Sequence, residues 1–288
     1  MDTQALQAFV TVADQGSFTA AADALFLTQP AVSKRIALLE EELQSRLFDR
    51  MGRHVALTEA GEALLPRARR ILLELEDTAR AIDNLSGEVA GRLRIGTSHH
   101  IGLHRLPPVL RRFSRAWPEV QLDIRFIDSE EAYEAVMHGE LELGLVTLPP
   151  RADPGTDTRV IWWDPLVVMA APDHALARGA PELADLTRHP ALLPSPTTFT
   201  RRIVEGLFRE NGLSLHVGQS TNYLETLHMM VSVGLGWSVL PATMLDERVC
   251  EIPIPGVSLS RNLGVVRHPA RSLSNAARRF LEVLDEYA

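Results

Sequence analysis

The 288-residue sequence contains one cysteine and no long apolar run, and each shortage excludes a class of protein. A lone Cys250 excludes an internal disulfide framework and a cysteine-based zinc site, and we expect it to be a small apolar core residue rather than a nucleophile. No apolar run reaches the roughly 18 residues of a membrane-spanning helix, so no membrane partner is expected. The N-terminus lacks a basic region ahead of an apolar stretch, which predicts no secretory signal and a cytoplasmic protein.

Enzyme signatures are missing as well. The sequence has no G-x-S-x-G, no phosphate-binding P-loop and no G-x-G-x-x-G after a strand. The pair Gly234 and Gly236 is too short a motif for a nucleotide site, and we expect these glycines to end a helix and allow a tight return to a sheet. We therefore predict that the protein is not an enzyme, has no catalytic residues and needs no cofactor.

Size and charge fit a folded protein of more than one domain. Hydrophobic residues make up 45% and charged residues 23% of the chain, which excludes a disordered or collagen-like protein. The formal net charge of −8 argues against non-specific binding to polyanions, although it is compatible with a short basic surface. Of the 29 basic residues only Lys34 is a lysine, and it lies beside Arg35.

Residues 1–58 are predicted to form three short helices followed by a hairpin. Apolar residues recur at helical spacing in the first and third segments, and Gly16 can end the first helix. The hairpin strands, 46–50 and 54–57, flank a turn that contains Gly52. The supporting residues are Leu6, Phe9, Val10 and Ala13 in the first helix, Ser17 as N-cap of a second helix through Leu25, and Thr28 as N-cap, Pro30 in the first turn and Val32, Ile36, Leu39 and Leu43 as the buried stripe of the third.

This arrangement describes a winged helix-turn-helix. Periodicity alone leaves open a plain three-helix bundle. If the segment binds DNA, the exposed N-terminal part of the third helix lies in the major groove and the basic wing contacts the backbone or the minor groove. The residues predicted to contact DNA are Thr28, Gln29, Pro30, Ser33, Lys34, Arg35, Arg50 and Arg53.

The same segment resembles the DNA-binding head of LysR-type transcriptional regulators. The matching stretches are F-V-T-V-A-D-Q-G-S-F-T-A-A-A-D-A-L at 9–25, L-T-Q-P-A-V-S-K-R-I-A-L-L-E-E-E-L at 27–43, L-F-D-R at 47–50 and L-T-E-A-G at 57–61. The resemblance continues more weakly through G-L-G-W-S-V-L-P at 234–241. It implies a regulator that binds double-stranded operator DNA, responds to a small-molecule effector and contacts RNA polymerase.

A long helix at 59–88 is predicted to link this head to the rest of the chain. Thr58 can cap it, and Pro66 should bend it locally. Its apolar positions are spaced like a coiled-coil seam over three heptads. The alternative is an amphipathic helix that packs on its own domain, but the resemblance implies dimerisation and a dimer of dimers. The seam consists of Leu64, Ala68, Ile71, Leu75, Thr78, Ile82 and Leu85.

Residues 89–288 change to alternating strands and helices, which predicts an α/β effector domain. A β-α-β-α-β pattern runs from Leu93 to Val146 and favours a parallel sheet with right-handed crossovers. A second such set follows, and chain crossings near 161–164 and 266–268 would form a hinge. The prediction is a doubly wound, two-lobed body similar to that of periplasmic binding proteins, with lobe I at 92–162 and 267–288 and lobe II at 163–266.

Ligands of such sheets bind beyond the carboxyl ends of the strands, where helix N-termini attract anions. Hydroxyl-rich segments occupy that place in both lobes, which predicts a small anionic effector between them. Each side chain could instead be an ordinary helix cap. The candidate effector-binding residues are Thr97, Ser98, His99, His100, Thr147, Ser195, Thr197, Thr198 and Asn222.

His100 and His104 have the spacing of two metal ligands on one helical face. Because no Asp, Glu or Cys completes the set nearby and Leu106-Pro107-Pro108 should interrupt a helix, no metal is predicted. A hydrogen-bonding or pH-sensitive role is the expectation for His99 or His100. Two other functions remain open, a solute-binding receptor without a DNA role and an enzyme built on the two-lobed body.

Overall fold

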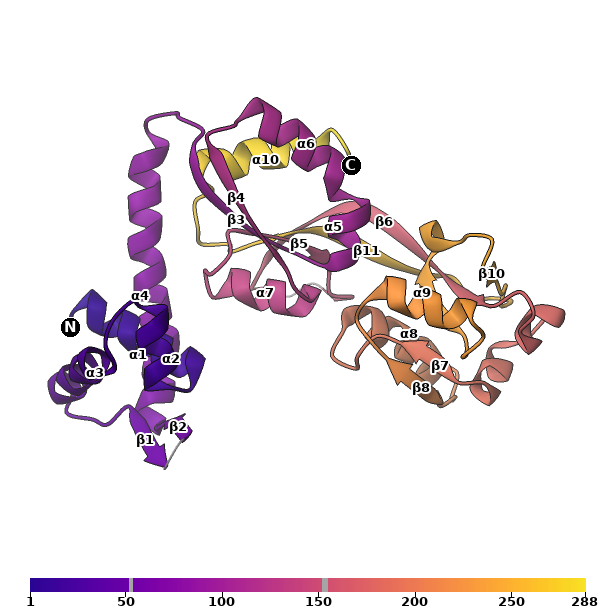
Figure 1. Cartoon of the computed structure of the whole chain (residues 1–288), viewed down its shortest axis with the longest axis horizontal. Coiled ribbons are helices and arrows are strands. Elements are labelled where there is room, and N and C mark those ends of the chain that lie inside the picture. The colour runs from indigo at the N-terminus through magenta and orange to yellow at the C-terminus, as the bar shows by residue number, and fades with distance from the viewer. Residues whose placement is uncertain (52–53, 152–154) are drawn as a thin grey trace. The chain divides into compact units, whose positions relative to one another are not determined.

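The computed structural model describes residues 1–51, 54–151 and 155–288, and the chain divides into two compact units (Figure 1). The first unit is Met1–Ser86 and the second is Gly87–Ala288. None of the described helices is both long enough and apolar enough to cross a membrane.

The first unit begins with the three predicted helices, α1 (Thr3–Gln15), α2 (Phe18–Ala24) and α3 (Gln29–Leu43). Gly16 ends α1 with a φ of 58°, as its position predicts. The Ser17 hydroxyl caps α2, whereas Thr28 precedes α3 without a side-chain capping bond. The stripe of α3 is buried at Val32, Ile36 and Leu39, but the prediction for Leu43 is wrong, because it lies at the exposed end of the helix.

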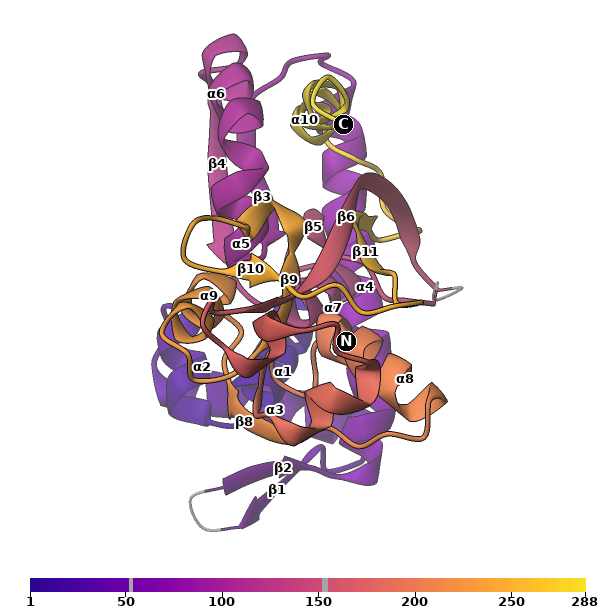
Figure 2. The same cartoon turned by 90° about the vertical axis from the view of Figure 1, so that its right-hand side faces the viewer.

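The wing is the hairpin of β1 (Phe48–Met51) and β2 (His54–Leu57), which pair antiparallel with Phe48 opposite Leu57. It projects from the three helices in Figure 2. The first strand begins two residues later than the predicted Arg46. Phe48 is buried against Phe9 and Phe18, with ring centroids 5.3 and 5.7 Å away, so the wing is anchored to the helical core.

Helix α4 (Glu59–Asn84) begins where Thr58 caps it, with the Thr58 hydroxyl 3.1 Å from the backbone nitrogen of Gly61. A side chain at Gly61 would meet the backbone oxygen of Leu47, so only glycine allows this close approach. The predicted coiled-coil seam divides into two halves with different surroundings. Its first half, Leu64, Ala68 and Ile71, packs into the core of its own unit, whereas its second half is exposed at Leu75, Ile82 and Leu85.

Lobe I of the second unit has the predicted β-α-β-α-β core. Strand β3 pairs in parallel with β4 on one side and β5 on the other. Helices α6 and α10 cover one face of the sheet and α7 covers the other (Figure 1). The sequence prediction missed the six-residue helix α5. The bounds are β3 (Gly91–Thr97), α5 (His99–His104), α6 (Leu106–Ala116), β4 (Val120–Phe126), α7 (Ser129–Met137), β5 (Leu143–Thr147) and α10 (Asn275–Asp285).

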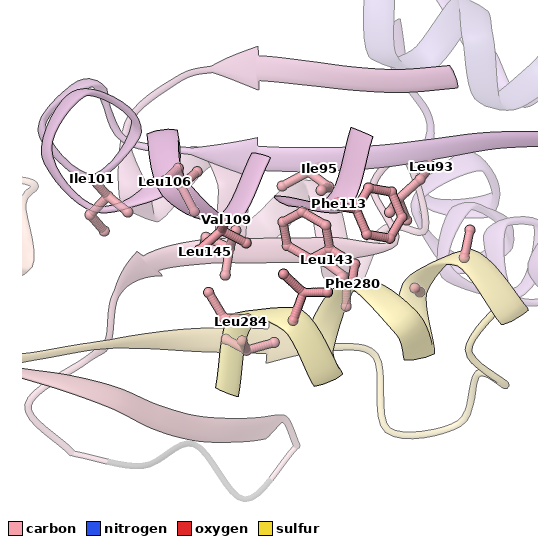
Figure 3. Packing of buried hydrophobic residues seen from close by; sticks show 14 of the residues in the cluster. Leu93, Ile95, Ile101, Leu106, Val109, Phe113, Leu143, Leu145, Phe280 and Leu284 are labelled. Carbon is pink, nitrogen blue, oxygen red and sulfur yellow. The ribbon is translucent and has the colours of Figure 1, made fainter. Parts of the chain in front are cut away.

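The apolar core of lobe I lies between the sheet and the helices α6 and α10 (Figure 3). Phe113 of α6 meets Phe280 of α10 edge-on, with ring centroids 5.2 Å apart, and both side chains are fully buried. Leu93 and Ile95 of β3 fill the sheet side of the same cluster. This packing fixes the C-terminal helix in lobe I, as predicted.

Two long antiparallel strands, β6 (Asp157–Ala170) and β11 (Leu259–Arg267), join the lobes. Part of β11, Leu263–Val266, pairs with β5 in lobe I. The predicted second crossing at 266–268 is therefore wrong, since the chain crosses before Leu263, and residues 263–266 do not belong to lobe II. The sequence of a strand does not reveal which lobe its partner strand belongs to, which is why this boundary was misplaced. The sheet order is β10-β6-β11-β5-β3-β4, with β9 also paired to β6.

Lobe II is built around the far end of β6. Its short parallel pair, β7 and β8, lies against helices α8 and α9, and the buried rings of Phe208 and Trp237 stack at 5.9 Å. Cys250 is half-buried, and burial raises the pKa of its thiol, which disfavours the reactive thiolate. The bounds are β7 (Ala191–Leu193), α8 (Phe199–Glu210), β8 (Val217–Ser220), α9 (Leu224–Ser232), β9 (Ser238–Pro241) and β10 (Cys250–Glu251), with short 3-10 turns at Ala175–Arg178, Leu183–Arg188 and Ala242–Met244.

Candidate functional site

The N-terminal part of α3 presents polar side chains to solvent. Thr28, Gln29, Pro30 and Lys34 are exposed, and Ser33 is half-buried. The Gln29 side-chain nitrogen donates a 2.9 Å hydrogen bond to the Ser33 hydroxyl one turn later. This contact holds the Gln29 amide along the exposed face of the helix, where hydrogen-bonding groups can meet base edges.

The basic residues predicted to bind DNA differ in their surroundings. Arg35 is half-buried, and its guanidinium donates a 2.8 Å hydrogen bond to the side-chain oxygen of Gln4 in α1. Arg50 belongs to β1, but its side chain lies outside the described part of the chain. Arg53 lies outside the described residues altogether.

In the second unit, a cavity of about 400 Å³ lies between the two lobes. That volume falls in the range of small-molecule sites. Most of its walls come from the segments after β3, β4 and β5 in lobe I and from the N-terminal ends of α8 and α9 in lobe II. Its lining consists of Ser98, His99, His100, Phe126, Ile127, Asp128, Ser129, Glu130, Glu131, Thr147, Pro194, Thr198, Thr200, Asn222, Tyr223, Leu224 and Arg261.

Six of the nine predicted effector residues line this cavity, namely Ser98, His99, His100, Thr147, Thr198 and Asn222. The other three, Thr97, Ser195 and Thr197, are not part of the lining. Thr97 is fully buried in the sheet, and its hydroxyl donates a 2.9 Å hydrogen bond to the backbone oxygen of Leu145. A position directly after a strand therefore does not guarantee that a side chain reaches the crevice.

Two of the lining hydroxyls act as helix caps. The Ser98 oxygen accepts from the backbone nitrogen of Ile101 at 3.4 Å, and the Thr198 oxygen accepts from that of Arg201 at 3.2 Å. The Thr198 hydroxyl donates to the backbone oxygen of Ser195 at 2.9 Å. The simple capping interpretation is thus correct for both residues, although both also face the cavity.

A carboxylate from lobe I occupies the N-terminus of α8 in lobe II. Glu130 accepts a 2.5 Å hydrogen bond from the backbone nitrogen of Phe199. Burial raises the pKa of the Glu130 carboxyl above its ordinary value, while the Phe199 hydrogen bond opposes the shift. Close by, Asn222 accepts from the backbone nitrogen of Ser195 and donates to the Asp128 carboxylate. These contacts tie the two lobes together through acidic residues that sequence reasoning missed.

Arg261 of β11 is a buried cation in the cavity wall. Its Nε donates to Asp164 at 2.8 Å and its Nη1 to the Thr200 hydroxyl at 3.0 Å. Its Nη2 is buried and has no hydrogen-bond partner among the described residues. Burial lowers the pKa of Arg261 and the neighbouring Asp164 opposes this. An arginine within a strand that joins the lobes is a sequence signal that could have identified this residue.

Beside the cavity, His100 and His104 of α5 face Glu225 of α9. The distances to Glu225 Oε1 are 3.4 Å from His100 Nδ1 and 3.1 Å from His104 Nε2. The argument that no acidic residue completes the histidine pair is therefore wrong, because folding brings Glu225 from the other lobe. Burial, with a smaller contribution from Arg261, lowers the pKa of His100 to about 4, which keeps its imidazole neutral near neutral pH. His99 instead packs edge-on against Tyr223, with ring centroids 5.4 Å apart.

Comparison with known proteins bears on both units. Residues 3–62 match the family described as "Bacterial regulatory helix-turn-helix protein, lysR family", and residues 86–288 match the "LysR substrate binding domain". The uncharacterized regulator YeiE of Escherichia coli K12 is 32% identical over 97% of this chain and 96% of its own. An uncharacterized regulator of Azotobacter vinelandii, from the ibpB-leuC intergenic region, is 68% identical over 38% of this chain and 75% of its own.

Solved structures of similar fold are also full-length LysR-type regulators. Full-length OxyR of Pseudomonas aeruginosa has a TM-score of 0.69 and 25% identity and covers 100% of this chain and 97% of its own. Full-length CbnR in complex with its target DNA has a TM-score of 0.63, 23% identity and full coverage of both chains, which supports the fold. The relatives are transcriptional regulators rather than enzymes. The chain therefore belongs to the LysR family of DNA-binding transcriptional regulators.

Proposed function

We propose that this LysR-type regulator is controlled by a small molecule with an anionic group, most simply a carboxylate, that binds in the cavity between the lobes. The observation that carries the proposal is the guanidinium of Arg261. It lies in the cavity wall, and its buried Nη2 has no partner among the described residues. A buried donor without an acceptor is costly, and a carboxylate oxygen would remove that cost.

Acidic side chains in the cavity wall restrict the charge of the effector. Asp128, Glu130 and Glu131 all line the cavity, and two of them already bind donors of lobe II. A ligand with several negative charges would meet repulsion from these carboxylates. We therefore favour an effector with a single carboxylate near Arg261 and with hydrogen-bond donors or a positive charge near α7.

For the DNA-binding unit, we propose that the N-terminal part of α3 enters the major groove and that the wing contacts the DNA backbone. The residues proposed to enter the groove are Gln29, Pro30, Ser33 and Lys34. The exposed end of α3 supports this placement. For assembly, we propose a dimer of dimers in which the exposed end of α4 pairs with a second copy. Such an oligomer would occupy two DNA sites and act beside RNA polymerase in the cytoplasm.

The first test is a gel shift with the DNA upstream of the protein's own gene, with and without metabolites that raise the unfolding temperature of the full chain. A ligand that binds only the native state raises that temperature by mass action. We expect sequence-specific binding and at least one carboxylate-bearing metabolite that changes the shifted band. A regulator without specific binding, or an effector without an anionic group, would contradict the DNA and the effector parts of the proposal respectively.

A further inference from the structure

The histidine pair of lobe I and Glu225 of lobe II form a cluster that the proposed effector does not require. His100 and His104 lie one turn apart on α5, with ring centroids 4.6 Å apart, and both point a nitrogen at Glu225 Oε1. The candidate ligand atoms of the three residues all lie within 4.8 Å of one another. His100 is only 4% exposed, so the cluster extends from the surface into the protein.

Two distances in the cluster are close to the ligand-to-ligand distance of a coordination sphere. Tetrahedral ligands at about 2.0 Å from a zinc ion lie about 3.3 Å from each other. The two nitrogen-to-oxygen distances of 3.4 and 3.1 Å are close to that edge length. The candidate ligand atoms lie up to 4.8 Å from one another, so a metal ion between them would require the imidazoles to move inward.

Hydrogen bonding alone leaves polar atoms of this cluster unsatisfied. Both imidazoles are directed at one oxygen, Glu225 Oε1. The second carboxylate oxygen, Oε2, is buried and has no hydrogen-bond partner among the described residues, and the same holds for His100 Nε2. A carboxylate that coordinates a cation with both oxygens needs no further hydrogen-bond donor. A bound cation would therefore account for the absence of a hydrogen bond to Oε2.

The donor set indicates the class of cation. Imidazole and carboxylate suit Zn²⁺, Co²⁺ or Ni²⁺, whereas Mg²⁺ and Ca²⁺ take oxygen ligands. Two histidines four residues apart on a helix with a glutamate from another segment also form known three-ligand zinc sites. Such a site keeps at least one coordination position for water or another small ligand.

We propose that His100, His104 and Glu225 bind one divalent transition-metal ion, represented here by Zn²⁺, and that the ion fastens lobe I to lobe II. The metal site does not depend on the effector, although His100 also lines the effector cavity. Its regulatory consequence, that the metal biases the lobes toward the closed arrangement in which the effector is held, rests on the proposed function.

The test is equilibrium dialysis of the full, tag-free chain against Zn²⁺, with Co²⁺ absorption as a second readout of coordination. The variants are His104→Ala and Glu225→Gln, which remove one ligand each. The matched control is His189→Ala, which changes a second histidine pair, His174 and His189, whose rings lie 4.9 Å apart. Circular dichroism without metal checks that each variant is folded. Glu225→Gln preserves size, so it remains informative if His104→Ala unfolds.

We expect the wild type and His189→Ala to bind one Zn²⁺ per chain and both ligand variants to lose at least tenfold in affinity, because even outer-shell changes at metal sites cost about 10- to 100-fold. Zn²⁺ should also raise the unfolding temperature of the wild type but not of the two variants. Equal Zn²⁺ affinity in all four proteins, or no binding by the wild type, would overturn the site. The metal measurements use neither DNA nor effector, so their failure is distinct from a failure of the proposed function.

Discussion

Glu130 of lobe I places its carboxylate 2.5 Å from the backbone nitrogen of Phe199, the first residue of helix α8 in lobe II. A helix N-terminus attracts negative charge, and the sequence predicts an anionic effector at this position. The protein's own side chain already supplies that charge. An effector anion must therefore displace Glu130 or bind elsewhere in the cavity, and Arg261 in the cavity wall has a buried donor without a partner among the described residues.

The raised pKa of Glu130 predicts a pH effect on stability. The folded state holds the Glu130 proton more tightly than the unfolded chain does. The contribution of Glu130 to the free energy of unfolding is therefore fully present at pH values below its ordinary pKa of 4.5. It is lost as pH rises through the raised pKa. Glu130→Gln keeps an oxygen for the Phe199 nitrogen and has no charge to bury. Its stability relative to the wild type should therefore increase as pH rises above 4.5.

Urea unfolding at a series of pH values checks this prediction. Glu134→Gln is the matched control, because Glu134 is an exposed residue of the same helix. Subtracting the variant curve from the wild-type curve also removes the opposite trend from His100, whose lowered pKa costs stability as pH falls. A constant difference between Glu130→Gln and the wild type would show that Glu130 does not titrate differently on folding.

Local patterns allowed much of the fold to be predicted. The buried stripe of α3 and the β-α-β-α-β core of lobe I depend on apolar spacing within short segments, and both are present. The seam of α4 shows the limit of this reasoning. Heptad spacing indicates which face of the helix is apolar. It does not indicate whether that face packs against the same chain or against another copy. Leu64 and Ile71 pack on their own unit, whereas Leu75 remains exposed.

The cavity and its surroundings were harder to predict because the key contacts there are long-range. His104 and Glu225 are separated by 121 residues, and Asp164 and Arg261 by 97. No local spacing reveals that two segments so far apart meet at a lobe boundary. Hydroxyls after strands were a useful guide to Ser98 and Thr198, but the charged residues that define the cavity come from helix α7 and from a crossing strand.

The exposed end of α4 predicts an oligomer interface. Leu75 is 48% exposed, and Ile82 and Leu85 are more so. Leu75→Glu would bury an unpaired charge if this face meets a second copy, at a cost of at least about 1–3 kcal/mol. We expect weaker self-association in sedimentation and weaker DNA binding. Ala81→Glu, an exposed position outside the seam, should behave like the wild type. If Leu75→Glu sediments as the wild-type oligomer, the interface lies elsewhere.

The exposed amide of Gln29 predicts base recognition. Removing it by Gln29→Ala should reduce discrimination between the target site and a site with one changed base by about 1–3 kcal/mol. Fluorescence anisotropy with both DNAs at fixed salt measures the difference. Gln7→Ala, an exposed glutamine on α1, is the control. An equal loss of affinity for specific and random DNA would assign Gln29 to positioning on the backbone instead.

The proposed effector site depends on Arg261. Removing it alone leaves Asp164 buried, although Arg105 also approaches that carboxylate at 3.4 Å. The double variant Arg261→Gln with Asp164→Asn removes both charges together and should remain folded. A hydrogen bond to a charged group contributes about 1.5–3 kcal/mol, so effector affinity should fall by about 10- to 150-fold. DNA binding without effector should be unchanged.

Calorimetry with the metabolite selected by thermal shift, together with a gel shift, makes that measurement. Arg202→Gln is the control, because Arg202 is exposed, donates to the backbone oxygen of Thr197 and does not line the cavity. The single variant Asp164→Asn separates the two charges, since it keeps Arg261 and should retain effector binding. If the double variant binds the effector as tightly as the wild type does, the anionic group does not pair with Arg261. The α8 N-terminus would then be the remaining candidate, and the effector would have to displace Glu130 to reach it.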